Sequence, residues 1–440
     1  MNMKLKNTIV LVAAALLSLT SCLKDQTDVF DVPSSQRMQA FLEGVRTQLS
    51  DPSNKNGWVL SYYPGKDYAT CYMGVVFTAH QVTAYSQDAP EEGVTSNYKL
   101  TEDVGPVLSF DTYNSVLHYF ATSDSQHYQA RGGDFEFEIK SVEKDRIVLR
   151  GKRSGNYCYL DKASKEIPAF LKEINDAEVD FDIVAFSGEV TGGLVEGYLD
   201  GASHTLSIGR KGAESTELVT ARYMIVPGGI HFNEPFDFQG VTFEDFVYVR
   251  DPENPTKGTL TGSGITFQKV VPDGYVTYNQ YLGKWKLVCD EGDNSFVVEL
   301  VEKEKGSSFT MKGFSSKFDV VLGYNAAMGR LSWVNQAVGS IGANTVVLAG
   351  WAAPAGTSLW PYLDEGVGMD GIVEDNSVEE LVVNFEDNGI AMSLMNSVVH
   401  GWVLWLLDPN GNSAGVCDSW SMTGTDYRLP GDISLTKIVE

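Results

Sequence analysis

The stretch Gly57–Tyr63, GWVLSYY, opens a long succession of short apolar segments that are separated by turn residues. The chain holds 43 glycines, 20 tyrosines and 21 phenylalanines. This usage favours many short strands joined by tight turns over long helices. Strands are expected, among other places, at Met73–Phe77, Val107–Phe110 and Val116–Phe120. The sequence therefore predicts a mainly β protein.

The opening stretch has a counterpart in the second half of the chain. Gly283–Val288, GKWKLV, repeats the glycine, the tryptophan and the apolar run. The closing strand Ile265–Val271 is echoed in the same way by Ile433–Val439. Matched starts and matched ends predict two related β units.

These signals divide the folded part into a first β domain at 57–271 and a second at 283–440, joined by a linker at 272–282. The linker contains Asp273-Gly274 and is predicted to act as a hinge. The first domain is the longer one, so it must carry an insertion. We place that insertion at a helix around Phe170.

A glycine and a tryptophan at the start of an apolar strand resemble the first strand of lipocalin-like barrels, in which the tryptophan plugs one end. Closing a sheet into a barrel removes its open edges, which suits a chain rich in short strands. A core tryptophan in a sandwich is the alternative. The predicted fold is thus two lipocalin-like or sandwich-like antiparallel β units, with a short N-terminal helix and one inserted helix.

The N-terminus has the layout of a secretory signal. Lys4 and Lys6 precede an apolar run at 9–17, which is too short to span a bilayer comfortably. The following Leu19–Cys22 resembles a bacterial lipobox, which implies cleavage before Cys22 and acylation of that residue. Acyl chains bind a membrane firmly, since each buried CH2 contributes about 0.8 kcal/mol. An ordinary signal peptide with an incidental cysteine is the alternative.

We therefore expect a signal peptide at 1–21, a polar tether at 22–33 and a lipid anchor at Cys22. An amphipathic helix is predicted at 34–51, because apolar residues recur there at helical spacing from Met38 to Leu49. One apolar stripe means that this helix packs against another element.

The charge of the chain excludes one class of partner. The formal net charge is -25, and removing the two signal lysines leaves 31 basic against 58 acidic side chains. Such a surface repels phosphate backbones, so nucleic acid is not expected to bind.

Four cysteines remain once Cys22 is acylated: Cys71, Cys158, Cys289 and Cys417. An even number in an exported chain permits disulfides, and their positions would suit one bridge in each domain. Four buried thiols that act as small apolar side chains are the alternative.

The sequence contains no recognisable catalytic, metal-binding or cofactor-binding motif. The six histidines are scattered, and none lies four residues from another. Gly366–Gly371 matches a dinucleotide fingerprint only in its spacing, and it is predicted to be a loop because no helical pattern follows. Asp408–Asn412 resembles a calcium loop, yet it is better interpreted as a hairpin turn. We therefore predict no enzyme activity, no metal and no cofactor.

Aromatic residues give a second candidate site. Trp351 and Trp360 lie at the two ends of a loop of small residues, with Tyr362 just beyond it. Rings at a barrel rim would form a platform for a sugar face or a peptide side chain. The alternative is that both tryptophans finish their strands and point inward.

A broader resemblance rests on the lipobox, on Asn56–Gly65 and on Gly105–Asn114. These stretches are similar to an uncharacterised family of Bacteroidota surface lipoproteins associated with starch-utilisation-type outer-membrane uptake systems. The resemblance covers mainly the first 160 residues and supplies no catalytic residues. It implies attachment to the outer membrane on the cell exterior, a transporter pair as partner and a peptide or an oligosaccharide as ligand.

The leading functional hypothesis is therefore a lipid-anchored accessory or ligand-binding protein of nutrient uptake. A lipocalin-like carrier of a small apolar ligand and a hydrolase with an unrecognised site are the alternatives. A closed cavity lined by rings would favour the carrier, and clustered carboxylates in an open cleft would favour the hydrolase.

Overall fold

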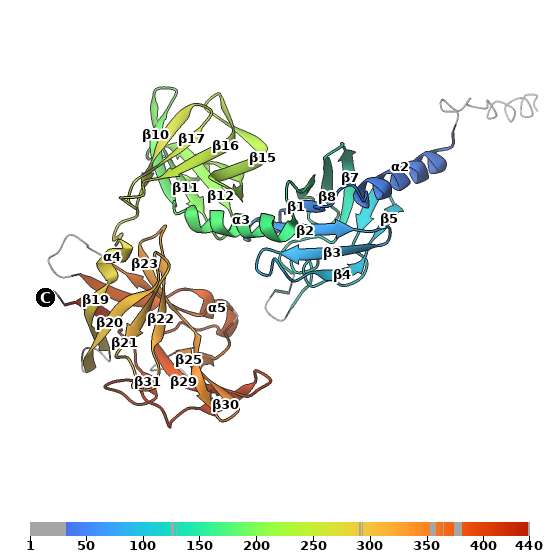
Figure 1. Ribbon diagram of the computed structural model, residues 1–440. Helices are drawn as coiled ribbons and strands as arrows, with labels where there is room; N and C mark the ends of the chain where they lie inside the picture. The colour runs from blue at the N-terminus through green and yellow to red at the C-terminus, as the bar shows by residue number, and fades with distance from the viewer. Residues whose placement is uncertain are drawn as a thin grey trace, which may run out of the picture.

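The computed structural model describes residues 32–124, 127–128, 130–289, 292, 294–352, 358–363, 365–373 and 381–438. It confirms the mainly β prediction. Three barrel-like antiparallel sheets follow one another along the chain, and the described part holds four α-helices (Figure 1). The predicted lipidation residue, Cys22, lies outside the described residues.

The helix α2 (Ser34–Leu49) leads into the first barrel, as predicted. Val45 and Leu49 are its buried residues. The first barrel has the strand order β4-β3-β2-β1-β9-β8-β7-β6-β5. Its strands are β1 (Trp58–Tyr62), β2 (Cys71–Phe77), β3 (Gln81–Ser86), β4 (Val94–Asn97), β5 (Lys99–Glu102), β6 (Pro106–Ser109), β7 (Glu136–Val142), β8 (Arg146–Gly151) and β9 (Tyr157–Lys162).

The two edge strands of this sheet, β4 and β5, are separated only by Tyr98. The Tyr98 backbone N–H donates to the His80 carbonyl at 3.3 Å, and the Tyr98 hydroxyl donates to the Thr78 carbonyl at 2.9 Å. These bonds hold a corner between the two halves of one bent strand. The sheet therefore closes on itself and exposes no long edge.

The second barrel repeats this plan, with the order β13-β12-β11-β10-β18-β17-β16-β15-β14. Its corner residue is Tyr223, whose N–H donates to the His204 carbonyl at 2.9 Å and whose hydroxyl donates to the Asp200 carbonyl at 3.3 Å. The strands are β10 (Ala185–Val190), β11 (Gly193–Asp200), β12 (Thr205–Arg210), β13 (Val219–Arg222), β14 (Met224–Val226), β15 (Gly229–Phe238), β16 (Val241–Arg250), β17 (Gly258–Gly262) and β18 (Ile265–Val270), with a 3-10 turn, η1 (Ser215–Glu217), before β13.

The third barrel is closed and carries a second sheet inserted between its strands. The barrel consists of β19 (Gly283–Cys289), β20 (Asn294–Glu304), β21 (Ser308–Lys312), β22 (Val320–Asn325), β23 (Arg330–Val334), β27 (Gly368–Ile372), β28 (Val382–Asp387) and β32 (Ser434–Lys437). The inserted sheet consists of β24 (Gln336–Ile341), β25 (Asn344–Trp351), β26 (Leu359–Trp360), β29 (Gly401–Leu407), β30 (Ser413–Val416) and β31 (Arg428–Leu429), and the helix α5 (Ile390–Met395) precedes β29.

The two glycine–tryptophan signals mark equivalent positions. Trp58 and Trp285 are fully buried on the first strands of their barrels. The Trp58 indole N–H donates to the Leu49 carbonyl at 3.0 Å, and that of Trp285 donates to the Tyr281 carbonyl at 2.8 Å. Each tryptophan therefore ties its barrel to the end of the helix that comes before it.

The second barrel uses a phenylalanine at the same place. The strand register pairs each ring with a lysine of the last strand: Trp58 with Lys162, Phe186 with Lys269, and Trp285 with Lys437. Because Phe186 replaces the tryptophan, the sequence signal that marks the other two barrels is missing here. The range 57–271, treated as one domain in the sequence analysis, thus holds two barrels.

The helix predicted around Phe170 is α3 (Ile167–Asp180), and it connects the first two barrels instead of interrupting one (Figure 1). Its apolar side chains form one small core with residues of both barrels: Val59, Tyr72, Ala163, Ile167, Leu171, Ile174 and Met224. The two barrels therefore share buried surface.

The predicted linker 272–282 is packed against the third barrel. It contains the short helix α4 (Tyr278–Tyr281). The Tyr275 hydroxyl donates to the Ala326 carbonyl at 2.9 Å, and the Tyr281 hydroxyl donates to the Gly329 carbonyl at 3.1 Å. Buried tyrosines thus fix the stretch predicted to be a hinge.

Candidate ligand-binding cleft

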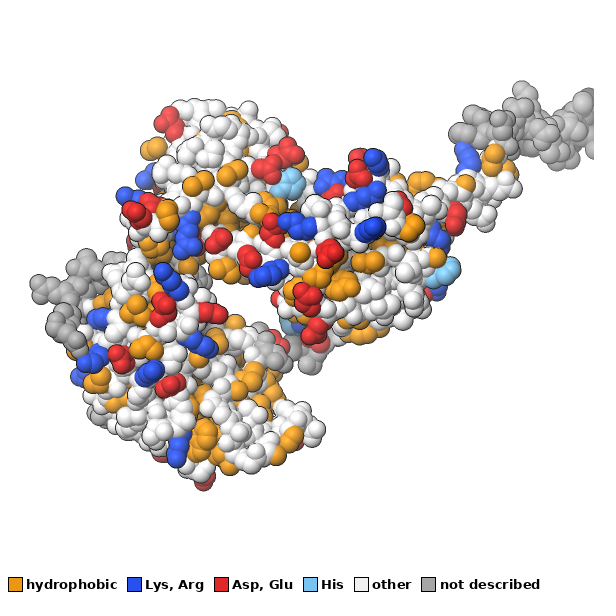
Figure 2. Space-filling view, in the orientation of Figure 1, with side chains coloured by type: hydrophobic (Ala, Val, Ile, Leu, Met, Phe, Trp, Pro, Cys, Tyr) orange, Lys and Arg blue, Asp and Glu red, His pale blue; other side chains and the backbone are white. Residues whose placement is uncertain are grey.

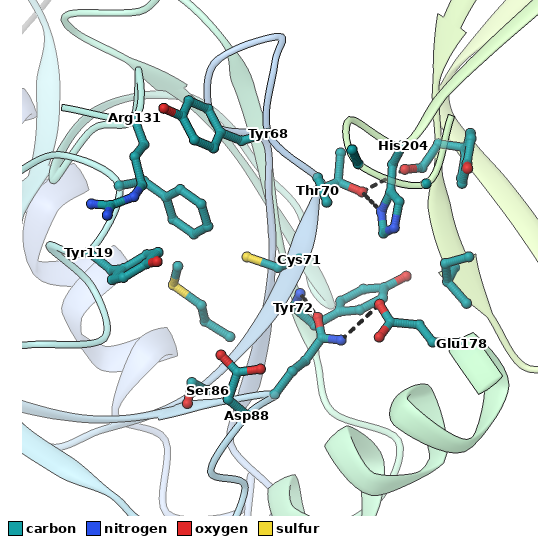
Figure 3. A pocket seen from close by; sticks show the side chains of 18 of the residues that line it. Tyr68, Thr70, Cys71, Tyr72, Ser86, Asp88, Tyr119, Arg131, Glu178 and His204 are labelled. Atoms are coloured by element: carbon teal, nitrogen blue, oxygen red, sulfur yellow. Dashed lines mark hydrogen bonds between the residues drawn. The ribbon is translucent and has the colours of Figure 1, made fainter. Parts of the chain in front are cut away.

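A cavity of about 1200 Å³ lies where the first barrel, α3 and the second barrel meet (Figure 3). The first barrel contributes residues 68–73 and 86–89, and the second contributes residues 199–202. The turn between β22 and β23 of the third barrel adds Asn325, Ala327 and Met328. In Figure 2 an opening separates the first and third barrels, and acidic side chains lie beside it.

One wall of the cleft comes from the long connection between β6 and β7. Tyr119 on this connection is 52% exposed, and the Arg131 guanidinium lies 4.4 Å from the centre of its ring. An ion pair of 3.0 Å to Asp124 holds Arg131 in place. One ring face is therefore occupied by a fixed cation, and the rest of Tyr119 lines the cleft.

This connection was predicted to contain a strand at Val116–Phe120, and that prediction is wrong. The Asn114 side-chain oxygen accepts hydrogen bonds from the backbone N–H groups of Val116 and Leu117, at 3.1 and 3.2 Å. An asparagine that bonds its own backbone in this way favours a turn over a strand. The alternating apolar residues here belong to a compact loop and not to a strand.

The opposite wall is the corner of the second barrel. The Thr70 hydroxyl donates to the Tyr223 carbonyl at 2.6 Å and lies 2.9 Å from Nδ1 of His204. Since the hydroxyl has one proton and donates it to the carbonyl, the Nδ1–H of His204 must donate to Thr70. Burial, aided by the nearby Arg222, lowers the pKa of His204 to about 4, so its imidazole is neutral at pH 7.

The floor of the cleft carries amide and carboxylate groups. The Gln87 side chain accepts the Tyr72 backbone N–H at 2.6 Å and donates to a Glu178 carboxylate oxygen at 3.3 Å. Glu178 is on the last turns of α3, and Asp88 follows Gln87 in the chain. Burial raises the pKa of Glu178, and the charge of Asp88 raises it further.

Cys71 lines this cleft, and it does not form with Cys158 the disulfide that the sequence permits. Both are free thiols, on β2 and β9, the two strands that flank β1. Strands two places apart are about 9.5 Å from one another, which exceeds the reach of a disulfide. Burial raises the pKa of both thiols, that of Cys158 to about 12, so they stay protonated.

The other predicted pair is also not bridged, because Cys417 is a free thiol. Cys289 and Cys417 both belong to the core cluster of the third barrel. This packing fits the alternative interpretation, in which the cysteines act as small buried apolar side chains.

The aromatic platform predicted from Trp351, Trp360 and Tyr362 does not form. In the β25–β26 pair, Trp351 is opposite Leu359 and Trp360 is opposite Gly350, so the two indoles lie on opposite faces of the inserted sheet. Trp351 packs on the outer apolar cluster, and Trp360 packs on the main core. Only Trp360 and Tyr362 are in contact, with ring centres 5.2 Å apart.

The structure also shows the glycine-rich stretch and the loop that resembles a calcium site. Gly366–Gly371 was predicted to be a loop, and this prediction is wrong from Gly368 onward, where the strand β27 begins. The strand β28 follows without a helix between them in the described residues. Asp408 accepts the backbone N–H groups of Asn410 and Asn412, each at 2.8 Å, within the connection from β29 to β30. In the described residues, no group of three or more metal-ligating side chains is found.

Comparison with known proteins places most of the first two barrels in one family. The family model described as Domain of unknown function (DUF4302) matches residues 26–250, more than half of the chain. The chain belongs to this family. A second model, described only as a domain of unknown function, matches residues 260–400. The DUF4302 match contains both opposing walls of the cleft, and the second match contains its third side.

Other comparisons add little to this DUF4302 assignment. No curated protein matches the chain. The β subunit of DNA polymerase from Streptococcus pyogenes aligns over 70% of this chain and 94% of its own, at 10% identity and a TM-score of 0.10. A likeness at this score carries no argument. Separately, none of the described helices is long and apolar enough to span a membrane.

The sequence analysis did not find the cleft. Its walls come from segments that are 85 residues apart, at Tyr119 and His204, and no motif joins them. One available signal was the aromatic-rich connection between β6 and β7, because long loops in compact domains are commonly functional.

Proposed function

We propose that this protein is a lipid-anchored binding protein of the cell envelope that takes a peptide or an oligosaccharide in the cleft between its barrels. The observation that carries the proposal is the cavity of about 1200 Å³, which has an aromatic wall, a polar floor and an open side. Concave sites with a few placed polar groups are the usual form of ligand sites.

The interiors of the barrels support a binding site between them instead of within them. Large side chains of the first barrel fill its own centre, among them Tyr62, Phe110 and Phe137, and the rings of Phe110 and Phe137 meet edge to face at 6.1 Å. A carrier of a small apolar ligand would need this volume.

A hydrolase is a second candidate, and one observation favours it. Asp88 and Glu178 both line the open cleft, and the raised pKa of Glu178 is what a general acid requires. Release of new reducing ends or amines from an oligosaccharide or peptide, lost in a Glu178→Gln variant, would establish the hydrolase.

The anchor and the partners belong to the same proposal. The lipobox at Leu19–Cys22 supports attachment to the outer membrane on the cell exterior, and the resemblance to Bacteroidota lipoproteins supports a transporter pair as partner. A Cys22→Ala variant should become soluble, and protease treatment of intact cells should remove the wild-type protein. A Cys22→Ala protein that stays in the membrane would contradict the anchor.

The cleft is tested with the soluble Cys22→Ala protein on arrays of peptides and oligosaccharides. Tyr119→Ala should weaken binding of the captured ligand roughly fivefold, since one ring contact contributes about 1 kcal/mol. Tyr198→Ala is the matched control, because that ring is 53% exposed on the second barrel and lies outside the cleft. Equal affinity of both variants would argue against the cleft.

A further inference from the structure

We infer that the ligand of the cleft is a basic peptide, with lysine or arginine side chains placed between Asp88 and Glu178. This inference rests on the proposed function and names the chemical class of its ligand. It follows from the charge of the cleft, from two carboxylates that form no ion pair within the described residues, and from the apolar lining.

The cleft is acidic. Five carboxylates line it, carried by Asp88, Glu92, Glu178, Asp200 and Glu365. Arg131 is the lining arginine in the described part of the chain, and its guanidinium is held by Asp124 and by the ring of Tyr119. An acidic cavity with low-dielectric walls concentrates cations.

Of the two histidines that line the cleft, His127 and His204, the second does not offset this charge. Burial keeps the pKa of His204 near 4, so this side chain carries no charge at pH 7. Nδ1 of His127 lies 2.9 Å from an Asp124 carboxylate oxygen, so this histidine also faces an acidic group of the protein.

Asp88 and Glu178 in particular have room for a cation. Within the described residues, no lysine or arginine forms an ion pair with either side chain, and Glu178 accepts a hydrogen bond from the neutral amide of Gln87. Glu178 is in a partly desolvated place, where a carboxylate gains more from a cationic partner than it would in water. The Glu178 carboxylate approaches the cavity from α3, and that of Asp88 approaches it from just after β3 (Figure 3).

The remaining lining suits a peptide better than a sugar. Val116 and Met328 are partly exposed and add apolar surface to the lining. Methionine side chains adapt to varied apolar partners, which fits peptide side chains. The exposed ring of Tyr119 can pack on the aliphatic stem of a lysine while the ammonium group reaches a carboxylate.

The experiment measures fluorescence anisotropy of labelled probes with the soluble Cys22→Ala protein. The probes are a short peptide of alternating lysine and alanine, the same peptide with glutamate in place of lysine, and a neutral oligosaccharide. We expect the lysine peptide to bind best and to weaken as salt is added. The double variant Asp88→Asn, Glu178→Gln should bind it roughly tenfold more weakly.

The matched control is Glu244→Gln with Glu299→Gln, two exposed carboxylates on barrel surfaces outside the cleft. All four side chains are accessible to solvent, although the Glu178 carboxylate is partly desolvated, and unchanged melting temperatures confirm folding. If the control variant loses as much affinity as the cleft variant, only net charge matters and the inference is wrong. If the neutral oligosaccharide binds in a Tyr119-dependent way and the lysine peptide does not, the basic peptide is rejected while the proposed function stands. If no probe and no array ligand binds, both are rejected.

Discussion

Arg222 is predicted to be the main polar link between the first and second barrels. Its guanidinium donates to the Pro64 carbonyl at 2.7 Å and to the Tyr68 carbonyl at 2.6 Å, and it lies 5.6 Å from the ring centre of Tyr63. Hydrogen bonds from a charged donor each contribute about 1.5 to 3 kcal/mol. Because the side chain is only part-buried, we take the lower end for each bond and expect Arg222→Ala to lower the free energy of unfolding by about 3 kcal/mol.

The assay is urea unfolding followed by tryptophan fluorescence and by far-ultraviolet circular dichroism. Loss of the link should also separate the transitions of the first two barrels, which now share the core around α3. Arg222→Lys should restore little, since a single ammonium cannot reproduce the two-carbonyl geometry of the planar fork. A loss below about 0.5 kcal/mol in Arg222→Ala, with coincident transitions, would refute this account of the interface.

Three further predictions concern other parts of the molecule. His204 is neutral in the folded protein because its pKa falls from 6.5 to about 4. As the pH is lowered, the unfolded chain binds this proton before the folded protein does, so the free energy of unfolding should fall by up to about 3 kcal/mol between about pH 6.5 and pH 4. A Thr70→Val variant should alter this pH profile, as measured by equilibrium unfolding. Trp351→Ala and Trp360→Ala should each lower the melting temperature, with a stability loss of about 2 to 4 kcal/mol, whereas unchanged melting would show that neither ring supports the inserted sheet. A chain that begins at Val271 should fold alone and give a cooperative melt, since the third barrel closes on itself, and an unstructured circular dichroism spectrum would contradict this.

Local sequence signals predicted the class of the fold and several of its details. The Trp285 opening and its counterpart at Trp58 marked two barrels correctly, because the buried indole and the preceding glycine are both visible in the sequence. The second barrel was merged with the first because Phe186 occupies the same place without the glycine–tryptophan pattern. A repeat whose marker residue has changed is invisible to a search for that marker.

The candidate site depended on long-range contacts that no local pattern contains. Thr70 and His204 are 2.9 Å apart in the fold although they are far apart in the chain. The alternation at Val116–Phe120 suggested a strand, yet the Asn114 side-chain oxygen accepts hydrogen bonds from the backbone there and turns the chain. A local side-chain hydrogen bond thus competed with strand pairing, and the apolar alternation alone did not reveal it.

The corner that closes each of the first two barrels also contacts the part of the chain that precedes the barrel. In the first barrel, Arg46 of α2 lies 5.8 Å from the ring centre of Tyr98. In the second, Thr70 of the preceding barrel is bonded at Tyr223 and His204. The side chains that form one wall of the cleft therefore also close the sheet of the second barrel. A mutation that reshapes this wall carries a folding penalty, so natural variation in ligand preference is expected to accumulate on the opposite, loop-borne wall.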